Sequence, residues 1–245
     1  MFSIFKRKYP ATAVDFSGIK TDMHSHLLPG IDDGSPDVEH SVQLKKGLED
    51  LGYQQFIATP HIMWDIYRNT SSTIHEALEK LRAEDKSQNI GAAAEYFMDE
   101  HFNSMIEKDE GLLALDDKKV LVEFSFVAAP MDLKEQLFNL QIKGYQPVLA
   151  HPERYTYFSG NKRVFEEFKS MGCLFQLNLL SLTGYYGKIP QELAHWLVAK
   201  NFIDLVGTDL HHDRHLEALR KGKAIMPVIM KLLETGRLIN PALVF

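Results

Sequence analysis

Two hydrophobic patterns alternate along the chain. Short apolar runs rich in β-branched residues are followed by segments in which apolar residues recur every three to four positions. The runs are typical of strands buried on both faces, and the recurring pattern is typical of amphipathic helices. The predicted strands are 19–26, 55–61, 90–96, 119–126, 146–151, 173–179 and 203–208. The predicted helices are 36–51, 70–87, 99–108, 132–143, 162–171 and 190–200, with further helical chain from about residue 215.

Capping residues mark several of these helix ends. Ser35 is the predicted N-cap of the first helix, with Pro36 at its first helical position. Gly144 and Gly172 follow two later helices, where a glycine can adopt the left-handed conformation that ends a helix.

The alternation of strands and helices predicts a parallel sheet covered by helices. Seven such units in 245 residues predict a single-domain α/β fold, a (β/α)7-like distorted TIM barrel, rather than an open doubly wound sheet. No glycine-rich phosphate loop follows the first strand, which also argues against a dinucleotide-binding fold. Residues 1–18 are predicted to form an N-terminal arm, and residues 19–245 the barrel.

Residues that can bind a metal gather where the predicted strands end, which is where a (β/α) barrel builds its active site. His24 and His26 are one residue apart on an extended strand, so both rings point to the same face. One such residue would be unremarkable, because a lone histidine is usually a core residue and a lone glutamate usually faces solvent. The strand-end residues of this kind are His24, His26, His61, Glu95, Glu123, His151, Asp209 and His211, with Asp33 in the loop after the first strand.

The ligand types in this set limit which metals can be expected. It contains five histidines, four carboxylates and no thiolate. Mixed imidazole and carboxylate ligands suit manganese, iron or zinc and exclude a cysteine-rich structural zinc site. Nine ligands are too many for one ion, so we expect two or three divalent ions with the metal site at the C-terminal ends of the strands. Clustered ions of this kind serve phosphoryl transfer.

Composition and charge argue against a nucleic-acid-binding, a membrane-spanning or a secreted protein. The net charge of −6 argues against a nucleic-acid partner, which needs a basic surface. No apolar run is long enough for a membrane span, and the N-terminal charges follow the apolar residues, unlike a secretory signal. The single cysteine, Cys173, fits a reducing compartment, so we expect a cytoplasmic location. Cys173 also lacks the C-x5-R loop of cysteine phosphatases.

These motifs resemble the polymerase and histidinol phosphatase (PHP) superfamily. More closely, they are similar to bacterial manganese-dependent protein-tyrosine phosphatases of capsule and exopolysaccharide operons, the CpsB/CapC/YwqE type. The resemblance runs from about residue 19 to the C-terminus. It rests on Asp22-Met23-His24-Ser25-His26 with Pro29-Gly30-Ile31-Asp32-Asp33-Gly34, Ala58-Thr59-Pro60-His61, Glu95, Val122-Glu123-Phe124, His151-Pro152-Glu153-Arg154-Tyr155 and Gly207-Thr208-Asp209-Leu210-His211.

The resemblance implies three ligand groups. The first metal would be held by His24, His26, Glu95 and Asp209. Glu95 would bridge to a second metal, held also by Glu123 and His151. The third would be held by Asp33, His61 and His211. Manganese is the expected metal, with iron or zinc as alternatives.

The resemblance also implies a function. The chain would be a phosphoric monoester hydrolase, a protein-tyrosine phosphatase in which a metal-bound hydroxide attacks phosphorus in line. Its partner would be the phosphotyrosine tail of a bacterial tyrosine kinase that regulates capsular or exopolysaccharide synthesis. The alternative is a PHP phosphoesterase acting on a small molecule such as histidinol phosphate. A nuclease and a non-catalytic metal scaffold are weaker alternatives, and an oligomer is possible.

Several polar and aromatic residues are candidates for roles beside the metals. Arg154, three residues after a predicted ligand, is a candidate catalytic and phosphate-binding residue, and its alternative role is a surface salt bridge. Arg214 is a second catalytic candidate, and Asp32 or His212 could protonate the leaving oxygen. The remaining substrate-binding candidates, which could equally pack on the barrel rim, are Arg68, Trp64, Tyr67 and Tyr186.

Overall fold

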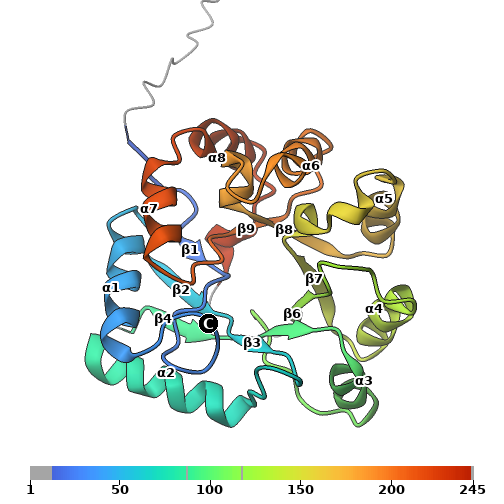
Figure 1. Cartoon of the computed structure of the whole chain (residues 1–245), viewed down its shortest axis with the longest axis horizontal. Coiled ribbons are helices and arrows are strands. Elements are labelled where there is room, and N and C mark those ends of the chain that lie inside the picture. Colours follow the sequence, from blue (N-terminus) through green and yellow to red (C-terminus); the bar gives the residue numbers. More distant parts are fainter. Residues whose placement is uncertain (1–12, 87, 117, 244–245) are drawn as a thin grey trace, which may run out of the picture.

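The computed structural model describes residues 13–86, 88–116 and 118–243 as one α/β domain. Strands lie in the interior, and helices surround them on the outside (Figure 1). None of the helices in these ranges combines the length and the apolar character that a membrane crossing requires.

The elements follow the predicted alternation. The strands are β1 (Thr21–Asp22), β2 (Gln55–Ala58), β3 (His61–Ile62), β4 (Ile90–Ala92), β5 (Glu95–Phe97), β6 (Lys119–Glu123), β7 (Gln146–Ala150), β8 (Leu174–Asn178) and β9 (Leu205–Gly207). The α-helices are α1 (Val38–Glu49), α2 (Ser71–Asp85), α3 (Glu100–Glu107), α4 (Leu133–Ile142), α5 (Arg163–Ser170), α6 (Lys188–Ala199), α7 (Asp213–Lys221) and α8 (Ile225–Glu234). Short 3-10 helices cover Pro152–Arg154, Thr156–Phe158, Leu179–Thr183 and Asn240–Ala242.

All the strand pairs of the described chain are parallel. One sheet has the order β1-β2-β4 and the other has the order β3-β5-β6-β7-β8-β9. The two sheets continue into one another, because the N–H of Glu95 donates to the carbonyl of Pro60. On the other side, a parallel bridge joins Ser25 to Leu210 beyond the ends of β1 and β9. The parallel sheet is therefore curled, as in a distorted barrel.

The structure divides two of the predicted strands, and it begins the first helix at a different residue. The prediction of one strand over 55–61 is wrong, because it divides at Pro60, which has no N–H to donate to a ladder. The predicted strand 90–96 likewise divides into β4 and β5. The first helix is capped by Asp37, whose carboxylate accepts from the N–H of His40, and not by Ser35.

Apolar side chains fill the interior of the curled sheet. Met23, Ile57, Leu121, Val148 and Leu205 form a buried cluster from five different strands or strand continuations. A larger cluster lies between the strands and the surrounding helices. This packing leaves the C-terminal ends of the strands as the place where polar side chains converge.

The predicted N-terminal arm is described only from residue 13. Residues 1–12 lie outside the described part of the chain. Phe16 is fully buried, and its N–H donates to the carbonyl of Leu51 beyond α1. Gly52, with φ of +99°, permits this contact, because a Cβ there would lie 2.7 Å from the backbone nitrogen of Ser17. The division at residue 18 stays a prediction.

Candidate metal centre

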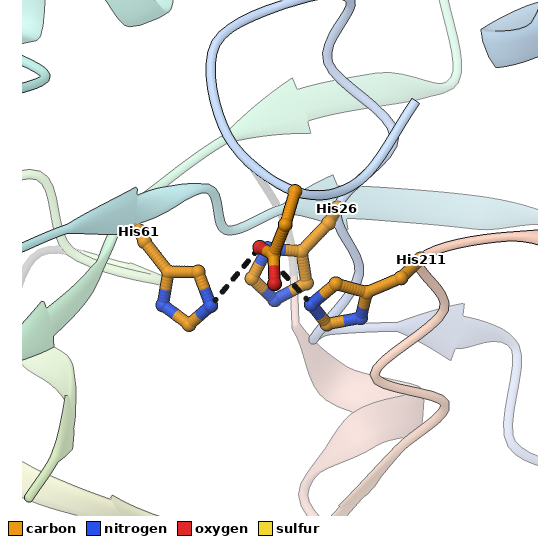
Figure 2. A group of neighbouring side chains, drawn as sticks. His26, His61 and His211 are labelled. Atoms are coloured by element: carbon orange, nitrogen blue, oxygen red, sulfur yellow. Dashed lines mark ion pairs between the residues drawn. The ribbon is translucent and has the colours of Figure 1, made fainter. Parts of the chain in front are cut away.

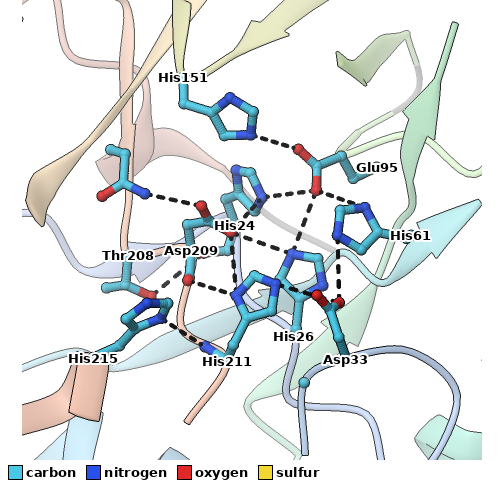
Figure 3. Close-up of polar contacts among 12 residues, drawn as sticks. His24, His26, Asp33, His61, Glu95, His151, Thr208, Asp209, His211 and His215 are labelled. Carbon is cyan, nitrogen blue, oxygen red and sulfur yellow. Dashed lines mark hydrogen bonds and ion pairs between the residues drawn. The ribbon is translucent and has the colours of Figure 1, made fainter. Parts of the chain in front are cut away.

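All nine predicted ligands lie at one end of the curled sheet, and Figure 3 shows the side chains of eight of them, all except Glu123, pointing toward one another. His24 and His26 follow β1, and the other seven come from later strand ends and loops. His151 and Asp209 have positive φ angles of 33° and 50°. Non-glycine residues pay a conformational cost for such angles, and they cluster at functional sites. The chain therefore turns sharply at two predicted ligands, directly after β7 and close after β9.

The first group of candidate ligands is fully buried and compact. The Nε2 of His24 lies 3.2 Å from the Oε2 of Glu95 and 3.4 Å from the Oδ1 of Asp209. The Nε2 of His26 lies 3.4 Å from each of the same two oxygens. Atoms bound to one first-row metal ion at about 2.1 Å are about 3.0–3.5 Å apart. The four atoms therefore have the spacing of ligands around a single ion.

Hydrogen bonds behind the rings orient both histidines. The Nδ1 of His24 lies 2.9 Å from the Oε1 of Gln176, which also accepts from the backbone N–H of His151. The Nδ1 of His26 lies 2.8 Å from the Oδ2 of Asp32. Because these oxygens only accept, each Nδ1 carries a proton, and a metal would be bound through Nε2, the ring nitrogen that faces the cluster.

The cluster leaves several buried polar atoms without a hydrogen bond. Among the described residues, the buried atoms that face the cluster and have no hydrogen bond are His24 Nε2, His26 Nε2, His61 Nδ1, Glu95 Oε2 and Glu123 Oε1. Buried polar atoms in native proteins almost always have a partner, and an unmet one costs about 1–3 kcal/mol. Divalent ions would satisfy all five atoms at once, so the residues fit the metal that the sequence motifs predict.

A second group shares Glu95 with the first. The Nδ1 of His61 lies 3.2 Å from the Oε2 of Glu95 and 3.0 Å from the Oε1 of Glu123. His151 lies on the other side of the carboxylates, with its Nε2 3.0 Å from the Oε1 of Glu95. The motif resemblance groups Glu95 and Glu123 with His151. In the structure, His61 also lies beside these two carboxylates. Glu95 is positioned to bridge two ions.

A third group surrounds the half-exposed carboxylate of Asp33. Its Oδ1 lies 3.6 Å from the Nε2 of His61 and 3.6 Å from the Nε2 of His211. The rings of His26 and His211 stack with their centroids 3.8 Å apart (Figure 2). The Nδ1 of His211 is held at 2.9 Å by the carbonyl of Asp209, so its Nε2 is free for a metal. His61 therefore offers one ring nitrogen to each of two groups.

The carboxylates of the cluster raise the pKa values of the histidines that face them. Burial lowers the pKa of His61, but Glu95 and Glu123 outweigh this and raise the pKa to about 9. The pKa values of His24 and His26 are raised in the same way, by the facing carboxylates against burial. Such imidazoles hold protons at neutral pH until a metal displaces them.

An open cleft of about 250 Å³ leads to the cluster. It is lined by Asp33, His61, Glu123, Phe126, His151, Arg154, Tyr186, Asp209, His211, His212 and His215. Arg154 donates to the Oδ2 of Asp209 at 2.9 Å. Its guanidinium lies 4.4 Å from the ring centroids of both Phe126 and Tyr186. Arg154 is thus a fixed cation at the edge of the candidate metal centre.

Three residues predicted at the rim lie outside the lining of this cleft. Trp64 stacks on the ring of His101 at 3.9 Å, and Arg68 donates to the carbonyl of Trp64 at 2.8 Å. Tyr67 stacks on the ring of His61 with a centroid distance of 5.6 Å. Of these, Tyr67 is in direct contact with a predicted ligand.

The other predicted catalytic residues take different positions. Arg214 is exposed and makes no hydrogen bond or ion pair within the described ranges. The carboxylate of Asp32 lies behind His26; burial raises its pKa, but the charge of His26 dominates and lowers the pKa to about 2. His212 lines the cleft and caps α7, where its Nδ1 accepts from the N–H of His215.

Sequence reasoning missed three residues of the site. Gln176 orients His24 from an apolar strand, where a glutamine has no recognisable motif. Phe126 and His215 line the cleft, although the sequence indicates only a strand end and a packed helix residue at these positions. Their proximity to the site could be suspected because both closely follow a predicted ligand in the chain.

Comparison with known proteins identifies the family. The family model for capsular polysaccharide synthesis, CpsB/CapC, matches residues 20–227. The chain belongs to the CpsB/CapC family. Tyrosine-protein phosphatase YwqE of Bacillus subtilis (strain 168) is 31% identical over 195 residues, which are 78% of this chain and 77% of YwqE. Tyrosine-protein phosphatase CpsB of Streptococcus pneumoniae is 27% identical over 202 residues, which are 78% of this chain and 82% of CpsB.

The CpsB/CapC fold is also matched by a solved structure. One chain from the crystal structures of YwqE from Bacillus subtilis and CpsB from Streptococcus pneumoniae has a TM-score of 0.77 and 29% identity to this chain. The match covers 91% of this chain and 90% of that chain. Those proteins are described as metal-dependent tyrosine phosphatases. The family predicted from the motifs is confirmed.

Proposed function

We propose that this CpsB/CapC chain is a metal-dependent protein-tyrosine phosphatase, a phosphoric monoester hydrolase. The observation that carries the proposal is the set of buried ligand atoms around Glu95 that make no hydrogen bond and converge on one another. The relatives named above are tyrosine-protein phosphatases, and the solved relatives are metal-dependent.

We assign two or three divalent ions to the three groups. The expected metal is manganese, with iron or zinc as the alternatives, because the donors are imidazoles and carboxylates. His24, His26, Glu95 and Asp209 would hold one ion, and Glu95 would share a second with Glu123, His61 or His151. Asp33, His61 and His211 would hold a third. When bound, such ions generate a nucleophile from water near neutral pH and stabilise the oxygens of an in-line displacement.

Arg154 would bind the phosphate of the substrate. Its guanidinium is a planar donor that suits phosphate oxygens, and Asp209 and the two flanking rings hold it in place. Asp32 would orient His26, and its depressed pKa makes it a poor proton donor. Arg214, exposed and unpaired, is the weaker of the two arginine candidates. The leaving oxygen would be stabilised at the metal centre or protonated from His212, which lines the cleft.

The substrate would be a phosphotyrosine in a protein tail. The cleft is open, and Phe126 and Tyr186 give it an aromatic wall on which a tyrosine ring can pack. Trp64 and Arg68, which lie outside the cleft, would contact a longer peptide rather than the phosphotyrosine itself, with Tyr67 beside His61. We expect a bacterial tyrosine kinase that regulates capsular or exopolysaccharide synthesis as the partner. The cytoplasmic location stays a prediction.

The same proposal includes a (β/α)7 barrel. β2 with β3 and β4 with β5 would each count as one strand position that is interrupted once. The parallel bridge between Ser25 and Leu210 would close the ring from the ninth strand segment back to the first.

The experiment is phosphate release from a phosphotyrosine peptide and from histidinol phosphate, with Mn²⁺ added and after chelation. We expect metal-dependent release from the peptide, abolished in His26→Ala and unchanged in the control His195→Ala, whose side chain is exposed on α6. Faster turnover of histidinol phosphate would favour the small-molecule phosphoesterase instead. Release that survives both chelation and His26→Ala would overturn the proposal.

A further inference from the structure

His215 lies in the wall of the cleft although it belongs to a surface helix. It is the third residue of α7, and only 8% of its surface is exposed. Its ring packs edge-on against Tyr185 at a centroid distance of 5.2 Å and lies 4.0 Å from the ring of His212. Figure 3 shows the ring beside His211, on the side of the cluster where β9 leads into α7. The ring is therefore held in one place by its neighbours.

One hydrogen bond determines where the proton of this ring lies. The backbone N–H of His211 points at the Nδ1 of His215 at 3.3 Å. A backbone N–H can only donate, so Nδ1 accepts and carries no proton. The proton of the ring is then on Nε2. Within the described chain, that Nε2 makes no hydrogen bond, and it is not among the enclosed atoms that lack a partner.

His215 lines the same cleft as Arg154. The ring of Tyr186 is close to both residues, because its centroid lies 4.4 Å from the Arg154 guanidinium and 6.2 Å from the ring centroid of His215. Both residues line the cleft that leads to the candidate metal centre. The cleft is thus lined by a cationic guanidinium and by an imidazole, both beside Tyr186.

We propose that His215 is a phosphate-binding residue, whose Nε2–H donates a hydrogen bond to a phosphoryl oxygen that Arg154 and the metals leave open. The assignment rests on the proposed function only in taking a phosphate as the ligand. A phosphorylated substrate has three peripheral phosphoryl oxygens, and two donors beside Tyr186 would give the phosphate a defined orientation. The hydrogen bond from the His211 backbone fixes the tautomer that this requires.

A crossed pair of substitutions separates this role from simple packing. His215→Asn places a carbonyl oxygen near the position of Nδ1, so it keeps an acceptor for the His211 N–H and removes the donor. His215→Gln reaches farther and keeps a donor near the position of Nε2, but it loses the acceptor. A phosphate-binding role predicts that the asparagine variant is the worse of the two, and a packing role predicts the reverse.

The measurement is calorimetric binding of inorganic phosphate to the Mn²⁺-loaded full chain, with metal content and melting temperature determined for each variant. A hydrogen bond to a charged group is worth about 1.5–3 kcal/mol, so we expect His215→Asn to weaken phosphate binding about 10-fold or more. His215→Gln should weaken phosphate binding by less than about 3-fold, because it keeps a donor near the position of Nε2. The control His195→Asn, exposed on α6, should bind phosphate like the wild type.

Two results would overturn the assignment. One is unchanged phosphate affinity in a folded, metal-replete His215→Asn, while the wild type binds phosphate. The other is loss of metal in step with loss of phosphate binding, which would make His215 a support for His211 only. If the metal-loaded wild type binds no phosphate at all, the proposed function itself fails, so the two failures are distinguishable.

Discussion

The Nδ1 of His24 lies 2.9 Å from the Oε1 of Gln176, which holds the opposite ring nitrogen toward the carboxylates of the candidate metal centre. Gln176 is fully buried on β8, a strand that contributes no predicted ligand of its own. Its contribution to the site is therefore the orientation of a neighbouring ligand.

Replacing Gln176 with leucine should weaken metal binding. The variant removes the acceptor that fixes the tautomer and the ring angle of His24, and such outer contacts change metal affinity by about 10–100-fold. The measurement is the dissociation constant for Mn²⁺ by calorimetry. Gln146→Leu, at the start of β7 and far along the strand from the cluster, is the control and should bind normally. Equal affinity in both variants would contradict the orienting role.

Glu95→Gln should disturb two ions at once. One oxygen of Glu95 faces both His24 and His61, so the amide removes a negative charge from two ligand groups together. We expect elemental analysis to show fewer ions per chain and phosphatase activity to fall at least about 100-fold. The matched control is Glu192→Gln, an exposed glutamate on α6. Full metal occupancy in Glu95→Gln would refute the bridging position.

Arg154→Lys should reduce activity without loss of metal. Lysine keeps the positive charge but lacks the planar fork and does not stack between Phe126 and Tyr186 in the same way. We expect kcat/KM to fall about 10-fold or more for a phosphotyrosine peptide, with unchanged metal content. Arg163→Lys, exposed on α5, serves as the control. If Arg154→Lys were as active as the wild type, a phosphate-binding role for Arg154 would be refuted. The residue would then serve only to pair with Asp209.

Metal binding should release protons and strengthen as the pH rises. In the metal-free protein, Glu95 and Glu123 raise the pKa of His61 to about 9 although burial opposes this, and His24 and His26 shift in the same direction. These rings hold protons below their raised pKa values, and a metal must displace them. Affinity should therefore increase from about pH 6 toward pH 9. Calorimetry in buffers of different ionisation enthalpy measures the protons released, and a pH-independent affinity would contradict this.

The convergence of the candidate ligands could be predicted from the sequence, because the C-terminal ends of parallel strands lie at the same edge of a sheet. The His24–His26 spacing is the clearest case, since both Nε2 atoms lie 3.4 Å or less from the same oxygen of Glu95. Alternation of side chains along an extended strand requires only local geometry, which a sequence pattern contains.

The remaining features depend on tertiary contacts that a local pattern does not encode. The break at Pro60 turns His61 so that its two ring nitrogens face different carboxylates. The rotation of α7 about its axis brings His215 into the cleft. Trp64 was expected as a substrate-binding residue, but its stacking partner, His101, comes from a helix about forty residues away in the chain, so the contact could not be predicted.

The most direct test of the account is a titration of metal-free protein with Mn²⁺, in which bound metal and phosphate release from a phosphotyrosine peptide are measured in the same samples. We expect no phosphate release without metal and a rise in release that follows occupancy beyond the first ion, because Glu95 joins two ligand groups. Glu95→Gln should lack this rise. Full activity in the metal-free chain, or activity in Glu95→Gln equal to the wild type, would contradict the central claim.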